Sequence, residues 1–142
     1  MSIQTEKEDP TGAAMKVCFP WGMPGLDYTE YILSSPAQDT PFYFLQSVEH
    51  PEVFMLLINP FAVYKDYEFD ISEETTEQLK IKDEKQVVVF CTVNTSRGID
   101  AITVNLLAPI VVNIEQLLGK QVVLNDKKYS LRTPLTGKEE GR

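Results

Sequence analysis

The stretch PFYFLQSVEHPEVFMLLI, residues 41–58, decides the fold class of this chain. Residues 42–48 are rich in aromatic and β-branched side chains, which favour a strand. Residues 53–58 are almost wholly apolar, as expected of a strand that is covered on both faces. Only a short polar break, EHPE at 49–52, separates the two runs. The stretch therefore predicts a β-hairpin.

Runs of the same kind lie on both sides of this hairpin, without the alternation of strand and helix that a parallel sheet needs. Further strands are expected at residues 3–5, 17–19, 28–33, 64–71, 86–93, 101–106, 109–114 and 121–124. Their spacing predicts a mainly β fold, a compact antiparallel β-barrel-like single domain over residues 1–135. The tail at 136–142 is polar, and we expect it to be disordered.

Two short helices are expected between these strands. Ser72 is typical of a helix N-cap, and Glu73 and Glu74 after it suit the positive end of the helix dipole. We therefore expect a helix over residues 73–79. A second helical turn is expected over 115–118, where the glycine that follows would end it.

Size and composition suit one domain without disulfides, because 43% of the 142 residues are hydrophobic. No run approaches 18 apolar residues, so we expect no transmembrane helix. Residues 1–10 carry three acidic side chains and no apolar core of a signal peptide, which favours a cytoplasmic location. Cys18 and Cys91 each lie in an apolar run, and we expect both to be reduced, buried thiols.

The charge of the chain is strongly acidic and uneven. A net charge of -8 disfavours direct binding to nucleic acid, because phosphate backbones are repelled. Residues 66–84 hold eight acidic side chains against two lysines, whereas residues 119–142 carry a net charge of +3. Two interpretations stay open: the asymmetry steers a charged protein partner, or it only keeps the domain soluble.

Within the acidic segment, residues 64–71 alternate between acidic and apolar side chains. Positions 67, 69 and 71 are apolar, and Asp66, Glu68 and Asp70 lie between them. A period of two places the three carboxylates on one wet face of a strand. The same acids could suggest a calcium loop, but the glycine and closing glutamate of such a loop are not in register. We therefore expect no metal here.

A catalytic site is not expected in this sequence. The single histidine, His50, lies in a turn next to Pro51, and no cysteine and histidine cluster has metal-ligand spacing. A nucleophilic pair of Cys91 and His50 is conceivable, since such residues meet only in space. The apolar run around Cys91 does not suit a thiolate, which needs an electropositive setting. We expect no cofactor, and we expect His50 and both cysteines to be dispensable for activity.

Several separated motifs together resemble one known family. They are FPWGMPGL at 19–26, the stretch 41–51 with LINPF at 57–61, NLLAPIVVN at 105–113, GKQVVL at 119–124 and YSLRTPL at 129–135. In this order they resemble the flagellar assembly factor FliW family over residues 17–135. The chain departs from the family at residues 6–14, where family members usually have a hairpin around a glycine.

The resemblance implies a compact, mainly antiparallel β-barrel-like fold and a non-enzymatic function. FliW proteins bind the translational repressor CsrA, a small basic RNA-binding dimer, and relieve its repression of flagellin mRNA. They also bind flagellin, which frees the repressor when flagellin accumulates. An acidic surface suits a basic partner. For Tyr64 and Tyr67 two interpretations stay open: they anchor the partner, or they pack in the barrel. The candidate partner-binding residues of this chain are Asn59, Tyr64, Asp66, Tyr67, Glu68 and Asp70.

Three hypotheses about the function follow. The first is a monomeric regulator that binds a CsrA-type repressor and flagellin, with no contact to nucleic acid or membrane. The second is a dedicated flagellin chaperone without a translational role. The third is a small enzyme that uses Cys91.

Overall fold

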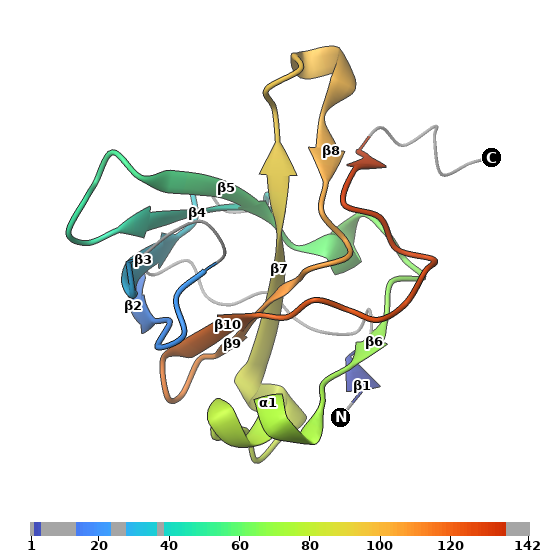
Figure 1. Ribbon diagram of the computed structural model, residues 1–142. Helices are drawn as coiled ribbons and strands as arrows, with labels where there is room; N and C mark the ends of the chain where they lie inside the picture. The colour runs from blue at the N-terminus through green and yellow to red at the C-terminus, as the bar shows by residue number, and fades with distance from the viewer. Residues whose placement is uncertain (1, 4–13, 24–27, 37–38, 136–142) are drawn as a thin grey trace.

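Seven strands join edge to edge into a closed ring (Figure 1). The computed structural model describes residues 2–3, 14–23, 28–36 and 39–135. Around the ring the strands follow in the order β7 (Val87–Asn94), β5 (Phe54–Ile58), β4 (Phe42–Ser47), β3 (Glu30–Ser34), β2 (Met15–Cys18), β10 (Leu118–Gln121) and β9 (Ile110–Asn113), which pairs with β7 again. The predicted mainly β, barrel-like fold is confirmed.

Almost all strand pairs of this barrel are antiparallel. The hairpin predicted from residues 41–58 is β4 and β5, with Phe42 opposite Ile58. The exception is the contact that closes the ring, where β10 meets β2 in parallel at Leu118 and Cys18. At that contact the Cys18 N–H donates to the Leu117 carbonyl at 2.9 Å. The barrel is thus closed between strands that are far apart in the sequence.

β7 is the central strand of the molecule, as its apolar run predicts. It pairs with β9 over residues 87–90, with β5 at 91–92 and with the short β8 (Thr103–Val104) at 93–94. β8 in turn pairs with β11 (Thr133–Pro134). Figure 1 shows β7 running past the barrel, with β8 beside its far end.

Alternate side chains of β7 enter two different hydrophobic cores. Val88 and Phe90 point into the barrel, where they pack with the aromatic rings of Phe19, Tyr31 and Tyr43. Their neighbours on β7 face the other way and are covered by an outer layer of loops and short helices. A strand between two cores must be apolar at successive positions, because each buried Val or Phe side chain stabilises the fold by about 1.5–3 kcal/mol.

The outer layer is formed by short elements that follow β5 along the chain. They are η1 (Pro60–Ala62), β6 (Phe69–Asp70), α1 (Glu73–Gln78) and η2 (Glu84–Gln86), and η3 (Ile99–Ala101) lies farther along, between β7 and β8. β6 pairs in antiparallel fashion with β1 (Ser2–Ile3), and Ile3 is fully buried in the outer core. Among the described helices, none combines the length and the apolar character needed to span a lipid bilayer.

The helix predicted from its cap is confirmed. α1 begins after Ser72, whose hydroxyl oxygen accepts from the Thr75 N–H at 3.1 Å. Leu79 ends the helix and is fully buried in the outer core. Local sequence is sufficient here, because the cap and the residues that it bonds lie within one turn.

The strand predicted over residues 64–71 is wrong in length, since only Phe69–Asp70 forms β6. The reason is that the first part of the segment turns, with the Tyr67 N–H donating to the Tyr64 carbonyl at 3.1 Å. The alternation itself is confirmed for burial. Residues 67, 69 and 71 are buried, whereas Glu68 and Asp70 are exposed.

The helical turn predicted over 115–118 is wrong. Residues 114–117 form the turn of the β9–β10 hairpin, and Leu117 adopts a positive φ of 57° there. Gly119 does not end a helix but lies in β10, where a Cβ atom would come within 2.6 Å of the Phe19 ring. The strand expected at 121–124 is accordingly displaced to 118–121. The expected tail at 136–142 and most of the atypical segment 6–14 fall outside the described residues.

Candidate partner-binding surface

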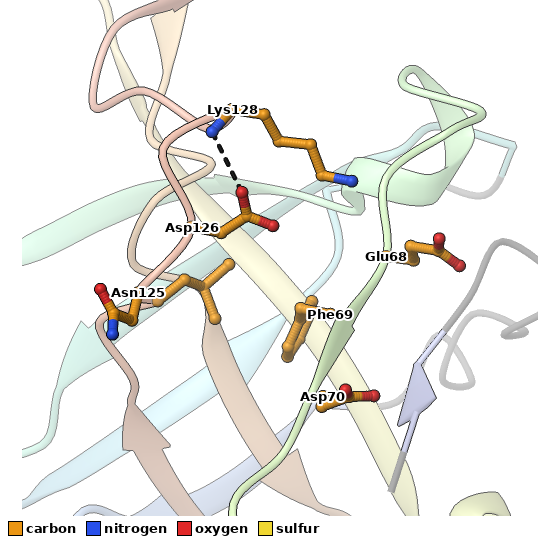
Figure 2. A pocket seen from close by; sticks show the side chains of 7 residues that line it. Glu68, Phe69, Asp70, Asn125, Asp126 and Lys128 are labelled. Carbon is orange, nitrogen blue, oxygen red and sulfur yellow. Dashed lines mark hydrogen bonds between the residues drawn. The ribbon is translucent and has the colours of Figure 1, made fainter.

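Three carboxylates lie in a row on the segment that precedes α1. Asp66, Glu68 and Asp70 are all exposed, and we call them the acidic ledge. Figure 2 shows the side chains of Glu68 and Asp70 directed away from the molecule, while Phe69 between them points inward. Three like charges in one row are tolerable only where water or a cationic partner meets them. All three acidic residues predicted for partner binding are exposed on this segment, where Glu68 and Asp70 border one hollow and Asp66 borders another.

Tyr129 holds the backbone of this ledge in place. Its hydroxyl accepts from the Glu68 N–H at 3.1 Å and donates to the Glu68 carbonyl at 3.0 Å. One side chain thus satisfies both backbone groups of a residue that lies outside any strand. We call these two hydrogen bonds from Tyr129 to Glu68 the clamp. The ammonium of Lys128 lies 5.4 Å from the centre of the Tyr129 ring, which places a cation beside the clamp.

Tyr67 lies inside the molecule rather than on the ledge. Only 1% of its surface is exposed, and its hydroxyl donates to the Leu106 carbonyl at 2.7 Å. Its ring packs edge to face on Tyr129, with centroids 4.8 Å apart. Tyr67 was predicted as an aromatic anchor for a partner, but its burial gives it a different part. Its ring packs against Tyr129 and so helps to position the hydroxyl that bonds Glu68.

Asn59 and Tyr64 lie on either side of η1 in the sequence. Asn59 is buried, and its side-chain oxygen accepts from the Phe61 N–H at 3.0 Å, so that it caps η1. Tyr64 is half-buried, and its hydroxyl donates to the Pro134 carbonyl at 2.8 Å. Of these two predicted residues, only Tyr64 presents part of its ring at the surface beside the ledge.

Two shallow hollows border the ledge. The one drawn in Figure 2 has a volume of about 380 Å³ and lies between residues 68–70 and the segment 124–128. In the latter segment the Asp126 carboxylate accepts from the Lys128 N–H at 3.1 Å. The second hollow, of about 410 Å³, lies between residues 63–67 and Tyr129. Both are open surface depressions that suit side chains of a protein partner better than an enclosed small molecule.

The residues considered for catalysis do not come together. His50 lies at the tip of the β4–β5 hairpin, against the ring of Tyr28 and 3.5 Å from a Glu52 carboxylate oxygen. Cys91 pairs with Ile58, at the other end of β5. Burial raises the pKa of the Cys91 thiol to about 12, so it is protonated at neutral pH. Nor does any group of three His, Cys, Asp or Glu side chains among the described residues have an arrangement that could hold a metal ion.

Comparison with known proteins shows to which family this chain belongs. A family model described as "FliW protein" matches residues 3–135. A Clostridium botulinum protein (strain Langeland) named "Flagellar assembly factor FliW" is 38% identical over 124 residues, with 87% of each chain covered. The chain belongs to the FliW family.

Other members of the FliW family agree with this assignment. A "Flagellar assembly factor FliW" of Geobacillus thermodenitrificans is 39% identical over 116 residues, which cover 82% of this chain and 81% of that protein. A solved structure, "Crystal structure of the flagellar assembly factor FliW", superposes with a TM-score of 0.77 at 38% identity and covers 84% of both chains. The family is thus one of flagellar assembly factors, and these names describe no enzyme.

Sequence reasoning missed the second side of this FliW surface. Lys128 and Tyr129 were not predicted as site residues, although they lie against the ledge in the fold. The motif YSLRTPL at 129–135 was visible as a family feature, but no local pattern links it to residues 64–70. The only available signal was a tyrosine directly after the two lysines at 127–128.

Proposed function

We propose that this chain is a non-enzymatic flagellar assembly factor that acts in the cytoplasm as a monomer and binds two proteins. One is a CsrA-type translational repressor, a small basic RNA-binding dimer whose repression of flagellin mRNA is relieved on binding. The other is flagellin, which competes for the factor and frees the repressor. Membership in the FliW family supports this proposal.

The observation that carries the proposal is the acidic ledge. Asp66, Glu68 and Asp70 are exposed on a backbone that Tyr129 fixes by two hydrogen bonds. A fixed row of carboxylates attracts a basic surface over roughly the Debye length of 8 Å in physiological salt. The same charges repel RNA phosphates near the bound repressor. The factor would therefore act on RNA only through the protein that it binds.

Charge reversal tests this proposal. We expect the variant Asp66→Lys, Glu68→Lys, Asp70→Lys to associate with the purified repressor at least tenfold more slowly at low salt, because steering acts mainly on the on-rate. The difference should shrink as salt rises, since the original attraction is itself screened. Stopped-flow fluorescence at two ionic strengths measures both effects.

A matched control reverses three exposed acids away from the ledge. Glu49 and Glu52 lie beside the β4–β5 turn and Asp100 lies in η3, and all three are exposed. Their reversal changes the net charge by the same amount. If both triple variants associate at the same rate, the ledge has no special part in binding.

The second hypothesis, a flagellin chaperone without a translational role, is separated by a different experiment. The purified factor is immobilised and offered equal amounts of purified repressor and purified flagellin in separate columns. Retention of flagellin alone would favour the chaperone, whereas retention of both proteins supports the regulator.

A further inference from the structure

β5 and β7 are hydrogen-bonded to each other over only two residue pairs. Leu57 lies opposite Thr92 and Ile58 opposite Cys91, and the ladder stops there. β5 nevertheless extends back to Phe54, and β7 continues forward to pair with β8. Figure 1 shows the two strands leaving their crossing in different directions, and we call the region between residues 54–56 and 92–96 the wedge.

Backbone groups of both strands face this wedge without a strand partner. The Ser47 N–H donates to the Val53 carbonyl at 2.9 Å, which directs the backbone groups of Val53 toward β4. Because the direction alternates along a strand, those of Phe54 and Leu56 are directed toward β7. The Leu56 carbonyl belongs to the ladder that flanks the Leu57 and Thr92 pair, which leaves the Leu56 N–H and both groups of Phe54 facing the wedge. On β7, the Asn105 N–H donates to the Thr92 carbonyl at 3.0 Å, toward β8, so the groups of Val93 are directed toward β5. The Val93 N–H belongs to the same ladder, and the Val93 carbonyl faces the wedge.

A groove of about 730 Å³ occupies the wedge. Residues 54–56 and 92–96 form most of its lining, which Met23, Asn105, Gln121, Leu131 and Arg132 complete. Phe54 and Leu131 are large apolar side chains that are 59% and 57% exposed. Proteins normally protect an open strand edge with lysine, proline or a bulge, and the run VFMLLI at 53–58 has neither lysine nor proline. The edge is therefore suited to pairing with another strand.

The charge of the groove indicates what kind of strand it accepts. Arg132 is the one charged residue among those that line it, on a chain whose net charge is -8. Among the described residues, the Arg132 guanidinium forms no ion pair. A guanidinium in a groove that is otherwise lined by uncharged residues complements a carboxylate on a bound segment.

We infer that this groove binds an extended segment of a partner protein, which adds as a strand to the free edge of β5. Main-chain hydrogen bonds to Phe54 and Leu56 would supply affinity, as in other cases of strand addition. Alternate apolar side chains of the segment pack on Phe54 and Leu131, and one carboxylate of the segment meets Arg132. This binding goes beyond the proposed function and does not depend on the acidic ledge.

The free edge can be tested first without any ligand. Amide hydrogen exchange followed by NMR should show rapid exchange at Phe54 and Leu56 and strong protection at Ile58, which is paired with β7. Protection of Phe54 and Leu56 equal to that of Ile58 would overturn the inference, since the edge would already be paired.

The occupant is tested with a library of linear seven-residue peptides displayed on phage. We expect selection for alternating apolar residues with at least one Asp or Glu, and a synthetic peptide of the selected sequence should protect the amides of Phe54 and Leu56. N-methylation at the alternate residues that face β5 should weaken the affinity at least tenfold, while methylation at the intervening residues should not. Absence of a selected sequence, or equal effects of both methylation patterns, would overturn the inference.

Substitutions in the protein locate the bound peptide. Phe54→Ser and Leu131→Ser should each weaken peptide binding at least fivefold, and Arg132→Glu should reverse the preference between peptides that carry Glu and Lys. Ile99→Ser is the control, because Ile99 is 82% exposed in η3 and does not line the groove. Equal losses for Ile99→Ser would contradict the site. A concentration-dependent dimer that Phe54→Ser dissolves would instead assign the edge to a second copy of this chain.

Discussion

At the residue scale, Cys91 and Tyr67 form a buried, hydrogen-bonded pair that has a structural role. The Cys91 thiol donates to the Tyr67 hydroxyl oxygen at 3.9 Å, and this hydroxyl donates in turn to the Leu106 carbonyl. Burial raises the pKa of both side chains, so both are neutral at physiological pH. The chain of hydrogen bonds joins the ledge segment, β7 and the residues after β8 in the outer core.

These raised pKa values predict a loss of stability in alkali. The ordinary pKa of the thiol is 9.0 and the folded value is about 12. Below pH 9 the thiol is protonated in both states and its contribution to stability is fully present. As the pH rises from 9 toward 12, the unfolded state loses its proton first, and the free energy of unfolding falls by up to about 1.4 kcal/mol per pH unit for this group.

Urea unfolding at several pH values measures this slope. Cys91→Ser is the informative variant, because it removes the ionising thiol. Placing a hydroxyl in the core should cost about 1 kcal/mol at pH 7, while partner binding survives. If the alkaline slope is unchanged in the variant, Cys91 is not the group that titrates.

Asn113 is a second residue whose amide is fully used inside the molecule. It is fully buried, and its amide nitrogen donates to the Leu79 carbonyl at 2.8 Å, which ties the end of α1 to β9. Its side-chain oxygen accepts from the N–H groups of Glu115 and Gln116 in the β9–β10 turn.

We predict that Asn113→Ala lowers the free energy of unfolding by about 3 kcal/mol, because several buried backbone groups lose their partner. Asn125→Ala is the matched control, since Asn125 is exposed and its loss should change stability by less than about 0.5 kcal/mol. Urea unfolding gives both values. Equal stability of the two variants would contradict the structural part assigned to Asn113.

At the element scale, the ledge segment and the last described segment stabilise each other. Tyr129 bonds the backbone of Glu68, and Tyr64 bonds the carbonyl of Pro134 in β11. Neither segment forms a long strand of its own, so these side chains replace the ladder that a sheet would supply. The exposed carboxylates therefore depend on contacts from another part of the chain.

Removing one hydroxyl should loosen the ledge. Tyr129→Phe keeps the ring against Tyr67 but leaves both backbone groups of Glu68 without this partner. We expect a loss of about 1–2 kcal/mol in stability, faster amide exchange at Glu68 and slower association with the repressor. Tyr64→Phe is the control, because it removes the bond to Pro134 and leaves the Glu68 clamp intact. Unchanged exchange at Glu68 in Tyr129→Phe would show that the clamp is not needed.

At the scale of the whole molecule, the barrel carries two separate surfaces. The acidic ledge lies on the outer layer, and the groove lies where β5 and β7 diverge. Residues 129–132 connect them, because Tyr129 borders the ledge and Arg132 borders the groove. Partners bound at the proposed ledge and groove sites would therefore both contact the segment 129–132.

We predict that flagellin and the repressor weaken each other's binding by the same factor, as linkage requires. Isothermal titration of the repressor into the free factor and into the factor saturated with flagellin measures that factor, and the reverse titration must agree. Size-exclusion chromatography of the three proteins together should show two binary complexes. A stable ternary complex with unchanged repressor affinity would remove the switch and leave the chaperone hypothesis.

Much of the fold could be predicted because its causes are local. The apolar runs at 42–48 and 53–58, the cap at Ser72 and the alternate burial of residues 67–71 each follow from neighbours within a few positions. The candidate site was predicted in part: the three carboxylates are exposed as expected, whereas Tyr67 is not. An alternation with a period of two separates the two faces of a segment, but it does not predict which aromatic side chain is buried in a core.

The β class, the start of α1 and the negative charge of the ledge follow from the sequence, since propensity, capping and charge are properties of short segments. The closure of the barrel at β2 and β10, the inward direction of Tyr67 and the bonds from Tyr129 to Glu68 depend on tertiary contacts. The bonded residues are 39 positions apart in the bond from Tyr67 to Leu106 and 61 apart in the clamp. Such contacts depend on which distant segments meet, and that choice is made by the packing of the whole chain around its two cores.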